Sequence, residues 1–369
     1  MPRTARLLLL ALLSIGPVAQ AQIRIGQTAG FTGPVAAGVK ETTDGARLWF
    51  DAVNARGGIA GQKIELVSLD DRFDPKLAGE NARTLAADAR VISLFLTRGT
   101  PHAQAILPVL QEAKLPLVGP STGAMVLHEP VQPWVYNVRA TYQREAERAV
   151  MHLATVGITR IAVIQVDDSF GADCMVGAQR GFKAAGVAPV AHETFDRAKP
   201  DYTALAPKVA GLQPQAVLFF GSGSAVADGI AALRRAGSRA QLVTLSNNAS
   251  SGFVKLLGDH ARGTIVMQVF PFERSLATRF VQEAQELAKA AGLPELTPAM
   301  LEGFAAARVM AEALRRAAPN PTREKLRTAL DGMGSFDIGG LEVSFSPRDH
   351  TGLTYVDISI IGADGRFKR

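Results

Sequence analysis

The residues with the clearest potential for chemistry are small hydroxyl side chains in loops that follow apolar segments. The segment GPSTG occupies residues 119–123, and another hydroxyl, Thr100, lies in RGTPHA. GPSTG fits the G-x-S-x-G pattern of hydrolases, in which a turn between a strand and a helix exposes a nucleophilic serine. In a second interpretation, Ser121 or Thr122 caps the following helix, and the free amides of that helix bind an anion.

A serine hydrolase would also need an acid and then a histidine further along the chain. Asp349 and His350 satisfy that order. However, the sequence has no HGGG-type segment for an oxyanion, and Asp349 cannot readily orient a histidine that directly follows it. The binding loop is therefore the preferred interpretation, and an exported hydrolase that uses Ser121 stays the alternative.

Other motifs of catalysis, metal binding or cofactor binding are absent. GSGSAV lacks the third glycine of the dinucleotide fingerprint, and Walker, C-x-x-C and H-E-x-x-H motifs do not occur. The six histidines lack metal-ligand spacing, so we expect them at the surface or in helix caps. DDRFDPK lacks the glycine and the glutamate of a calcium loop and predicts a solvated turn. The prediction is a protein that is not an enzyme, without cofactor or metal.

Length and composition indicate an ordinary globular protein. The chain has 369 residues, 47% hydrophobic and 20% charged, which at about 150 residues per domain suggests two domains. This composition excludes a disordered tail, a collagen-like fibre and a disulfide-stapled miniprotein. The net charge of +6 is scattered along helical segments, so a nucleic-acid partner is not expected. The single cysteine, Cys174, is predicted to be a small packed residue.

The first 21 residues, MPRTARLLLLALLSIGPVAQA, predict a secretory signal peptide. Two arginines precede a short apolar block, and alanines at positions 19 and 21 form an A-x-A cleavage site. The block is too short to span a bilayer of about 30 Å. We therefore expect a soluble, periplasmic mature chain that begins at Gln22.

Short apolar runs alternate with helical patterns from residue 23 onward, and the same rhythm restarts at residue 160. This alternation predicts an α/β protein with two doubly wound parallel sheets, followed by long helices over 276–291 and 297–318. Ligands of open parallel sheets bind beyond the carboxyl ends of the strands. The loops at those ends are rich in Gly, Ser, Thr and Asn, and they include both hydroxyl loops described above.

Several segments in this order resemble the periplasmic substrate-binding proteins of the branched-chain amino-acid (Leu/Ile/Val) type, which serve ABC importers. They are TGP, NARGGIAGQKIELV, LDDRFDP, GPSTGA, DDSFGAD, LFFGSGS and GGLEVSFSPRDHTGLTYVD. The resemblance implies a type I periplasmic-binding fold, in which two lobes joined by a three-strand hinge close on a ligand. The first lobe would comprise residues 22–140 and 269–352, and the second residues 141–268 and 353–369.

The resemblance also implies which residues bind the ligand. Thr100, Ser121 and Thr122 of the first lobe match positions that hold the ligand carboxylate with hydroxyls and backbone amides. Residues of the second lobe would cover the ligand as the cleft closes: Tyr142, Phe170, Ser222, Ser224, Asn247 and Asn248. The expected partners are a small carboxylate or amino acid and the permease of an ABC transporter, and the protein is expected to be a monomer. A ligand sensor with the same fold is a further alternative.

One departure from the family bears on the ligand. Amino-acid-binding members commonly carry an acidic residue in the loop that aligns with LSNNASS, where it pairs with the ligand ammonium. This chain has Asn247 and Asn248 there. Loss of that carboxylate should weaken zwitterion binding by roughly 3–5 kcal/mol unless another acid substitutes. A carboxylate without an amine therefore competes with an amino acid as the ligand.

Overall fold

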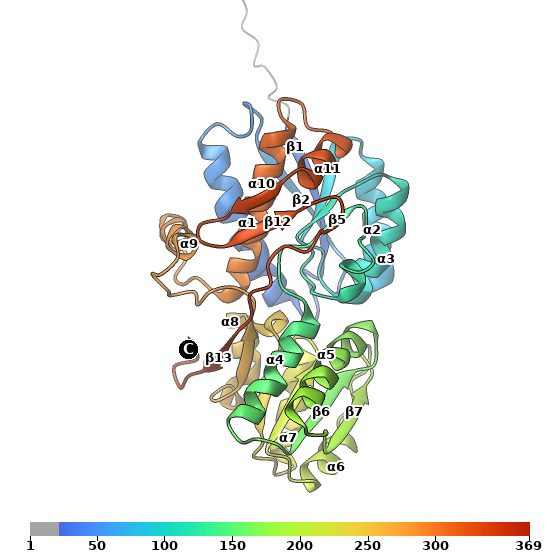
Figure 1. The fold of residues 1–369 in the computed structure, drawn as a ribbon, viewed down its shortest axis with the longest axis vertical. Coiled ribbons are helices and arrows are strands. Elements are labelled where there is room, and N and C mark those ends of the chain that lie inside the picture. The colour runs from blue at the N-terminus through green and yellow to red at the C-terminus, as the bar shows by residue number, and fades with distance from the viewer. Residues whose placement is uncertain (1–21) are drawn as a thin grey trace, which may run out of the picture.

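The computed structural model describes residues 22–369, so the predicted signal peptide lies outside the described residues. Two lobes follow one another along the long axis of the molecule, each with its own β-sheet (Figure 1). Each sheet alternates with helices along the chain, which confirms the predicted α/β fold with two lobes. The first lobe contains the start of the chain and a later return, and the second contains the middle and the last strands.

The sheet of the first lobe is parallel and has the strand order β2-β1-β3-β4-β5. All residues of β3 are buried, because helices cover both faces of a sheet of this type. The strands are β1 (Ile23–Ala29), β2 (Ile64–Asp70), β3 (Val91–Phe95), β4 (Leu117–Val118) and β5 (Val135–Tyr136).

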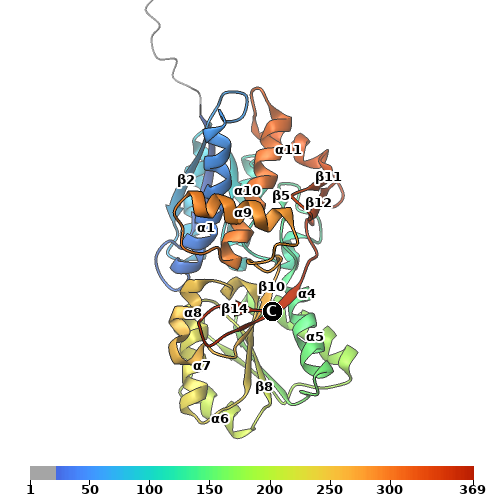
Figure 2. The same cartoon turned by 90° about the vertical axis from the view of Figure 1, so that its left-hand side faces the viewer.

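Two sets of helices cover this sheet. α2 and α3 share one buried apolar cluster with β3 and β4, and α1, α9, α10 and α11 share another with β1 and β5. Figure 2 shows α9 beside α1 and α10 on one side of the first lobe. The helices are α1 (Ala36–Ala55), α2 (Pro75–Ala87), α3 (Thr100–Glu112), α9 (Arg279–Ala290), α10 (Pro298–Ala317) and α11 (Arg323–Asp331).

The second lobe has a sheet of order β14-β13-β10-β9-β8-β6-β7. Its strands from β6 to β10 are parallel, but β13 pairs antiparallel with β10 and β14 pairs antiparallel with β13. The predicted parallel-sheet lobes are therefore confirmed, and the antiparallel pairs of this sheet are confined to one edge. The strands are β6 (Ile161–Val166), β7 (Ala191–Phe195), β8 (Ala216–Phe220), β9 (Gln241–Thr244), β10 (Ile265–Gln268), β13 (Asp357–Ile361) and β14 (Phe367–Lys368).

Some helices of the second lobe begin at polar side-chain caps. The Asp168 side chain accepts hydrogen bonds from the amides of Phe170 and Gly171, and the Thr141 hydroxyl accepts one from Arg144. The helices are α4 (Tyr142–Thr155), α5 (Ser169–Ala185), α6 (Leu205–Gly211), α7 (Ser224–Arg235) and α8 (Ser251–Leu257).

Three segments carry the chain between the sheets: β5 to α4, β10 to α9, and the stretch from β12 to β13. Before the last of these, β11 (Gly334–Asp337) and β12 (Glu342–Phe345) form a separate antiparallel pair on the first lobe. None of the helices in residues 22–369 is long and apolar enough to cross a membrane. Cys174 is buried in the apolar cluster of the second lobe.

Two predictions about polar residues are wrong. His102, His128 and His350 are buried, although the histidines were expected at the surface or in caps. Burial lowers the pKa of both His102 and His128 to about 4, so these rings are neutral near pH 7. Asp71, expected in a solvated turn, is buried and accepts a hydrogen bond from the Thr28 hydroxyl. Burial raises the pKa of Asp71 to about 6.

Candidate functional site

The two hydroxyl loops of the first lobe lie side by side, at the carboxyl ends of β3 and β4. The amide of Ser121 donates to the carbonyl of Thr97 over 2.9 Å, in a bridge that continues the parallel pairing of the strands. The hydroxyls of Thr100 and Thr122 are 2.9 Å apart and share a hydrogen bond. All three predicted first-lobe residues are buried in one small polar cluster.

No α-helix follows GPSTG, so the prediction that Ser121 or Thr122 caps one is wrong. The next element is a single 3₁₀ turn, η1 (Met125–Leu127), which begins after Ala124 without a side-chain cap. The loop is held by close packing instead: a Cβ on Gly123 would lie 2.5 Å from the carbonyl of Ala140. An anion site at a helix terminus therefore has no basis in this loop.

Arg98, which the sequence analysis did not select, is the cation of this cluster. Its side chain is buried, and its Nη1 donates to the Ser121 hydroxyl at 3.3 Å. Its Nη2 donates to the backbone carbonyl of Asn247, in the second lobe. In the described part of the chain no carboxylate lies within ion-pairing distance of it. Arg98 thus brings an uncompensated positive charge to the boundary between the lobes.

The asparagines of the second lobe have different roles. Asn248 is held on both sides of its amide: it donates to Gly221 and Thr244 and accepts from the amide of Gly223. Asn247 donates to the Ser222 hydroxyl over 3.0 Å, but its buried Oδ1 has no hydrogen-bond partner among residues 22–369. Asn248 therefore positions the loop, whereas Asn247 leaves one buried acceptor unsatisfied.

Tyr142 and Phe170 form an aromatic pair, with ring centroids 4.8 Å apart and edge-to-face geometry. Arg139 lies over the Tyr142 ring at 4.5 Å from its centroid. Burial raises the pKa of Tyr142 to about 12, so its hydroxyl stays protonated and can donate. The pair combines an apolar surface with one polar group, as expected for residues that cover the apolar part of a ligand.

Arg139 is fully buried in a network that joins the lobes. It pairs with Glu145 of α4 and, at 3.8 Å, with Glu302 of α10. It also donates to the Ser246 hydroxyl over 2.7 Å, while Glu145 accepts from the amide of Ser246. These two carboxylates are therefore already paired with a cation of the protein, which leaves the charge of Arg98 uncompensated.

A cavity of about 480 Å³ lies between the lobes. It is lined by residues 33–38 at the start of α1, by Arg98, and by second-lobe residues that include Ser224, Asn247, Asn248 and α8. The other predicted residues (Thr100, Ser121, Thr122, Tyr142, Phe170 and Ser222) are not in its lining. Arg98 links the two groups, because it touches both Ser121 and Asn247.

Contacts between the lobes surround this cavity. The amide of Ser224 donates to the carbonyl of Pro34 over 3.2 Å. The carboxylate of Glu41 on α1 accepts from the amide and hydroxyl of Ser251 and from the amide of Gly252. α8 of the second lobe is thus held at its N-terminus by a side chain of the first.

The geometry gives the hydrolase alternative no support. His350 engages Asp331 through Nε2 and backbone carbonyls through Nδ1, and the hydrogen bonds of the Ser121 hydroxyl in the described residues are with Arg98. Ser121 also lacks the strand-to-helix turn that exposes a nucleophile.

Two hinged α/β lobes with a cavity between them define the class of bilobed ligand-binding proteins. Residues 22–365 match the family model described as "Periplasmic binding protein", and the chain belongs to this family. The resemblance seen in the sequence is thereby confirmed.

Individual proteins agree with this assignment. The Leu/Ile/Val-binding protein BraC3 of Rhizobium johnstonii is 28% identical over 59% of this chain, a match that spans 60% of its own length. The Leu/Ile/Val-binding protein homolog 3 of Brucella melitensis is 26% identical over 83% of this chain and 82% of its own. The crystal structure of a substrate-binding periplasmic protein from Ralstonia solanacearum is 32% identical, covers 94% of this chain and 99% of that one, and has a TM-score of 0.86.

Proposed function

We propose that this protein is the periplasmic receptor of an ABC importer and that it captures a small organic carboxylate without an α-amino group. Thr100, Ser121 and Thr122 bind the carboxylate on the first lobe together with Arg98. Tyr142, Phe170, Ser222, Ser224, Asn247 and Asn248 cover it from the second lobe. The first 21 residues direct export, and the monomeric, closed form delivers its ligand unchanged to a permease.

The observation that carries this proposal is the buried guanidinium of Arg98. A buried charge without a partner is costly, and a guanidinium matches a carboxylate in a bidentate geometry. Hydroxyls of the neighbouring loops supply further donors, and the free Oδ1 of Asn247 accepts from a ligand N–H or O–H group. An ammonium group next to Arg98 would meet a like charge instead.

Leucine and 4-methylpentanoate test the ligand class, because they share a carbon skeleton and differ only in the ammonium group. We expect titration calorimetry to show 4-methylpentanoate binding at least about tenfold more tightly, since a like-charge contact and a missing partner carboxylate both disfavour the zwitterion. The pair 3-phenylpropanoate and phenylalanine repeats the comparison with an aromatic body. Tighter binding of either amino acid than of its matched acid would contradict the proposed class.

Arg98→Gln tests the role assigned to this residue. We expect it to weaken binding of the preferred acid by about a hundredfold, because a charged hydrogen-bonded pair is lost. Arg144→Gln, on an exposed position of α4, is the matched control and should bind like the wild type. Equal affinity of the wild type and Arg98→Gln would show that Arg98 does not hold the ligand.

A further inference from the structure

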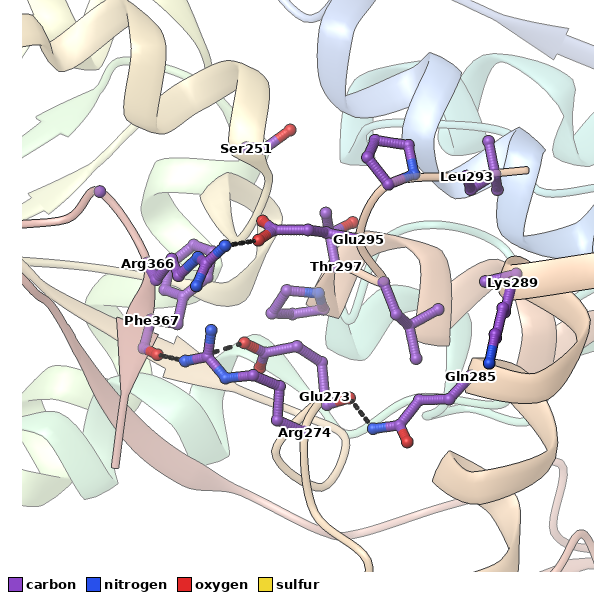
Figure 3. A pocket seen from close by; sticks show the side chains of 15 residues that line it. Ser251, Glu273, Arg274, Gln285, Lys289, Leu293, Glu295, Thr297, Arg366 and Phe367 are labelled. Carbon is purple, nitrogen blue, oxygen red and sulfur yellow. Dashed lines mark hydrogen bonds and ion pairs between the residues drawn. The ribbon is translucent and has the colours of Figure 1, made fainter. Parts of the chain in front are cut away.

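A second cavity, of about 360 Å³, lies between the lobes on another side of α8. Figure 3 shows how elements of both lobes surround it: the segment from β10 to α9, α9 itself and the loop before α10 on one side, and the C-terminal hairpin and Ser251 on the other. Arg98 and Asn247 do not line it. It is therefore distinct from the cavity assigned to the transported ligand.

The walls of this cavity are largely apolar. Ala288, Leu293, Leu296 and Pro298 from one stretch of the chain, and Phe367 from its last strand, supply alkyl and aromatic surface. A cavity of this size with mixed lining suits a small organic molecule that has an apolar body and few polar groups.

Glu273 supplies a carboxyl group to these walls, and it lacks a hydrogen-bond donor from another side chain. The residue is only 5% exposed. In residues 22–369, its side chain accepts no hydrogen bond from another residue; it forms only a long ion pair with Arg274, whose Nη2 atom lies 3.7 Å away (Figure 3). The guanidinium of Arg274 is held elsewhere, since it donates to the carbonyl of Phe367 and lies over the ring of Phe272.

The other charged groups around the cavity lie at its rim. Arg274, Lys289, Glu295 and Arg366 are exposed, and Glu295 pairs with Arg366. Solvent and salt screen exposed charges strongly, whereas a buried carboxyl is screened little. The buried charged group that a ligand meets inside the cavity is therefore Glu273, whose only charge partner among the described residues is the half-exposed Arg274 and whose burial raises its pKa to about 7.

We infer that this cavity is a second ligand site, which binds a small molecule with a primary ammonium group on an apolar body. The ammonium supplies the donors that Glu273 lacks, and the apolar body covers Leu293, Leu296 and Phe367. The two cavities thus select opposite charges: Arg98 faces the first, and Glu273 faces the second.

The probe for this inference is 3-methylbutylamine, with 3-methylbutan-1-ol as its uncharged analogue. Backbone amide spectra of the isotope-labelled chain should show saturable shifts at Leu293, Leu296 and Phe367 with the amine, and binding at least about tenfold weaker for the alcohol. Shifts confined to the cleft around Arg98 and Asn247, or the absence of saturable shifts, would overturn the inference.

Two variants distinguish the contribution of the Glu273 charge to amine binding from the contribution of the cavity volume. Glu273→Gln should weaken amine binding by about tenfold or more, and Leu293→Trp should weaken it by filling the cavity without altering a charge. Glu286→Gln, at an exposed position of helix α9, is the matched control. Unchanged amine binding in a folded Glu273→Gln protein would refute the site. If that variant does not fold, unchanged binding in Leu293→Trp refutes it equally.

Discussion

Gly223 lies at a contact between the lobes, and its lack of a side chain matters there. Its φ is +55°, and an added Cβ would lie 1.8 Å from the carbonyl oxygen of Pro34 on the other lobe. The amide of the next residue, Ser224, donates to the same carbonyl. The close approach of the lobes at this point therefore depends on a glycine.

Gly223→Ala should keep the lobes apart and weaken ligand binding by at least about tenfold, because contacts made only in the closed form are lost. Calorimetry measures the affinity, and small-angle X-ray scattering with ligand measures the closure. Gly237→Ala is a matched control: its φ is +84°, so the backbone strain is similar, but an added Cβ meets nothing within 4 Å. Similar affinities for the two variants would show that strain, not closure, causes the loss.

The residues that sequence analysis selected have positions that follow from the strand order, whereas the position of the residue that it missed depends on a distant contact. Ser121 and Thr122 lie in the loop after β4, and Thr100 begins α3 directly after the loop that follows β3. The carboxyl ends of parallel strands meet at one edge, so their proximity follows from the fold. Arg98 lies in the loop just before Thr100, but an arginine in a loop is normally solvated. Its burial depends on Asn247, 149 positions away, and no local pattern contains that contact.

At the scale of elements, α1 and α8 are coupled across the lobes. Glu41 on α1 accepts three hydrogen bonds from the first residues of α8, which are backbone and side-chain donors of the second lobe. A carboxylate that satisfies free amides at the start of a helix stabilises it by roughly 0.5–2 kcal/mol. Here that stabilisation exists only while the lobes are together.

Glu41→Ala should therefore weaken ligand binding while the separate lobes keep their fold. We expect a loss of about 1 kcal/mol, or roughly fivefold in affinity, with a small change in melting temperature. Titration calorimetry and thermal unfolding measure the two quantities. Glu80→Ala, an exposed glutamate of α2, provides the comparison. An equal loss of affinity in both variants would contradict the coupling.

The elements that sequence analysis found are longer than those that it missed. Long apolar strands such as β1, β6 and β8 and long helices such as α10 have periodic patterns, and their positions agree with the prediction. The short elements β5, β14 and α6 were not predicted. Each is too short for a period to emerge, and its pairing or packing comes from distant residues.

At the scale of the whole molecule, buried histidines make stability depend on pH. His128 bonds to the Thr351 hydroxyl at 3.0 Å through Nδ1, on the segment that leads back to the second lobe. Burial, and then the charge of Arg139, lower its pKa from 6.5 to about 4. The unfolded chain thus binds a proton between pH 6.5 and 4 that the folded protein excludes.

His128 leaves the free energy of unfolding at its full value above pH 6.5. As the pH falls toward 4, protonation of His128 in the unfolded chain lowers this free energy by roughly 3 kcal/mol at most. His128→Gln should remove this slope, so the stability of the variant relative to the wild type should rise as the pH falls. Urea unfolding at several pH values measures it. His192→Gln, at an exposed position of β7, should show a constant difference. A constant difference for His128→Gln as well would contradict the assignment.

The strand order of the larger sheet has a consequence for biosynthesis. Its members come from residues 161 to 368, and β13 and β14 at its edge are the last strands of the chain. A nascent polypeptide therefore lacks the edge of this sheet until residue 368 has been synthesised, although its five parallel strands are complete by residue 268. The returning helices α9, α10 and α11 are made between these two points, so the second lobe can complete its sheet only after the covering helices of the first lobe exist.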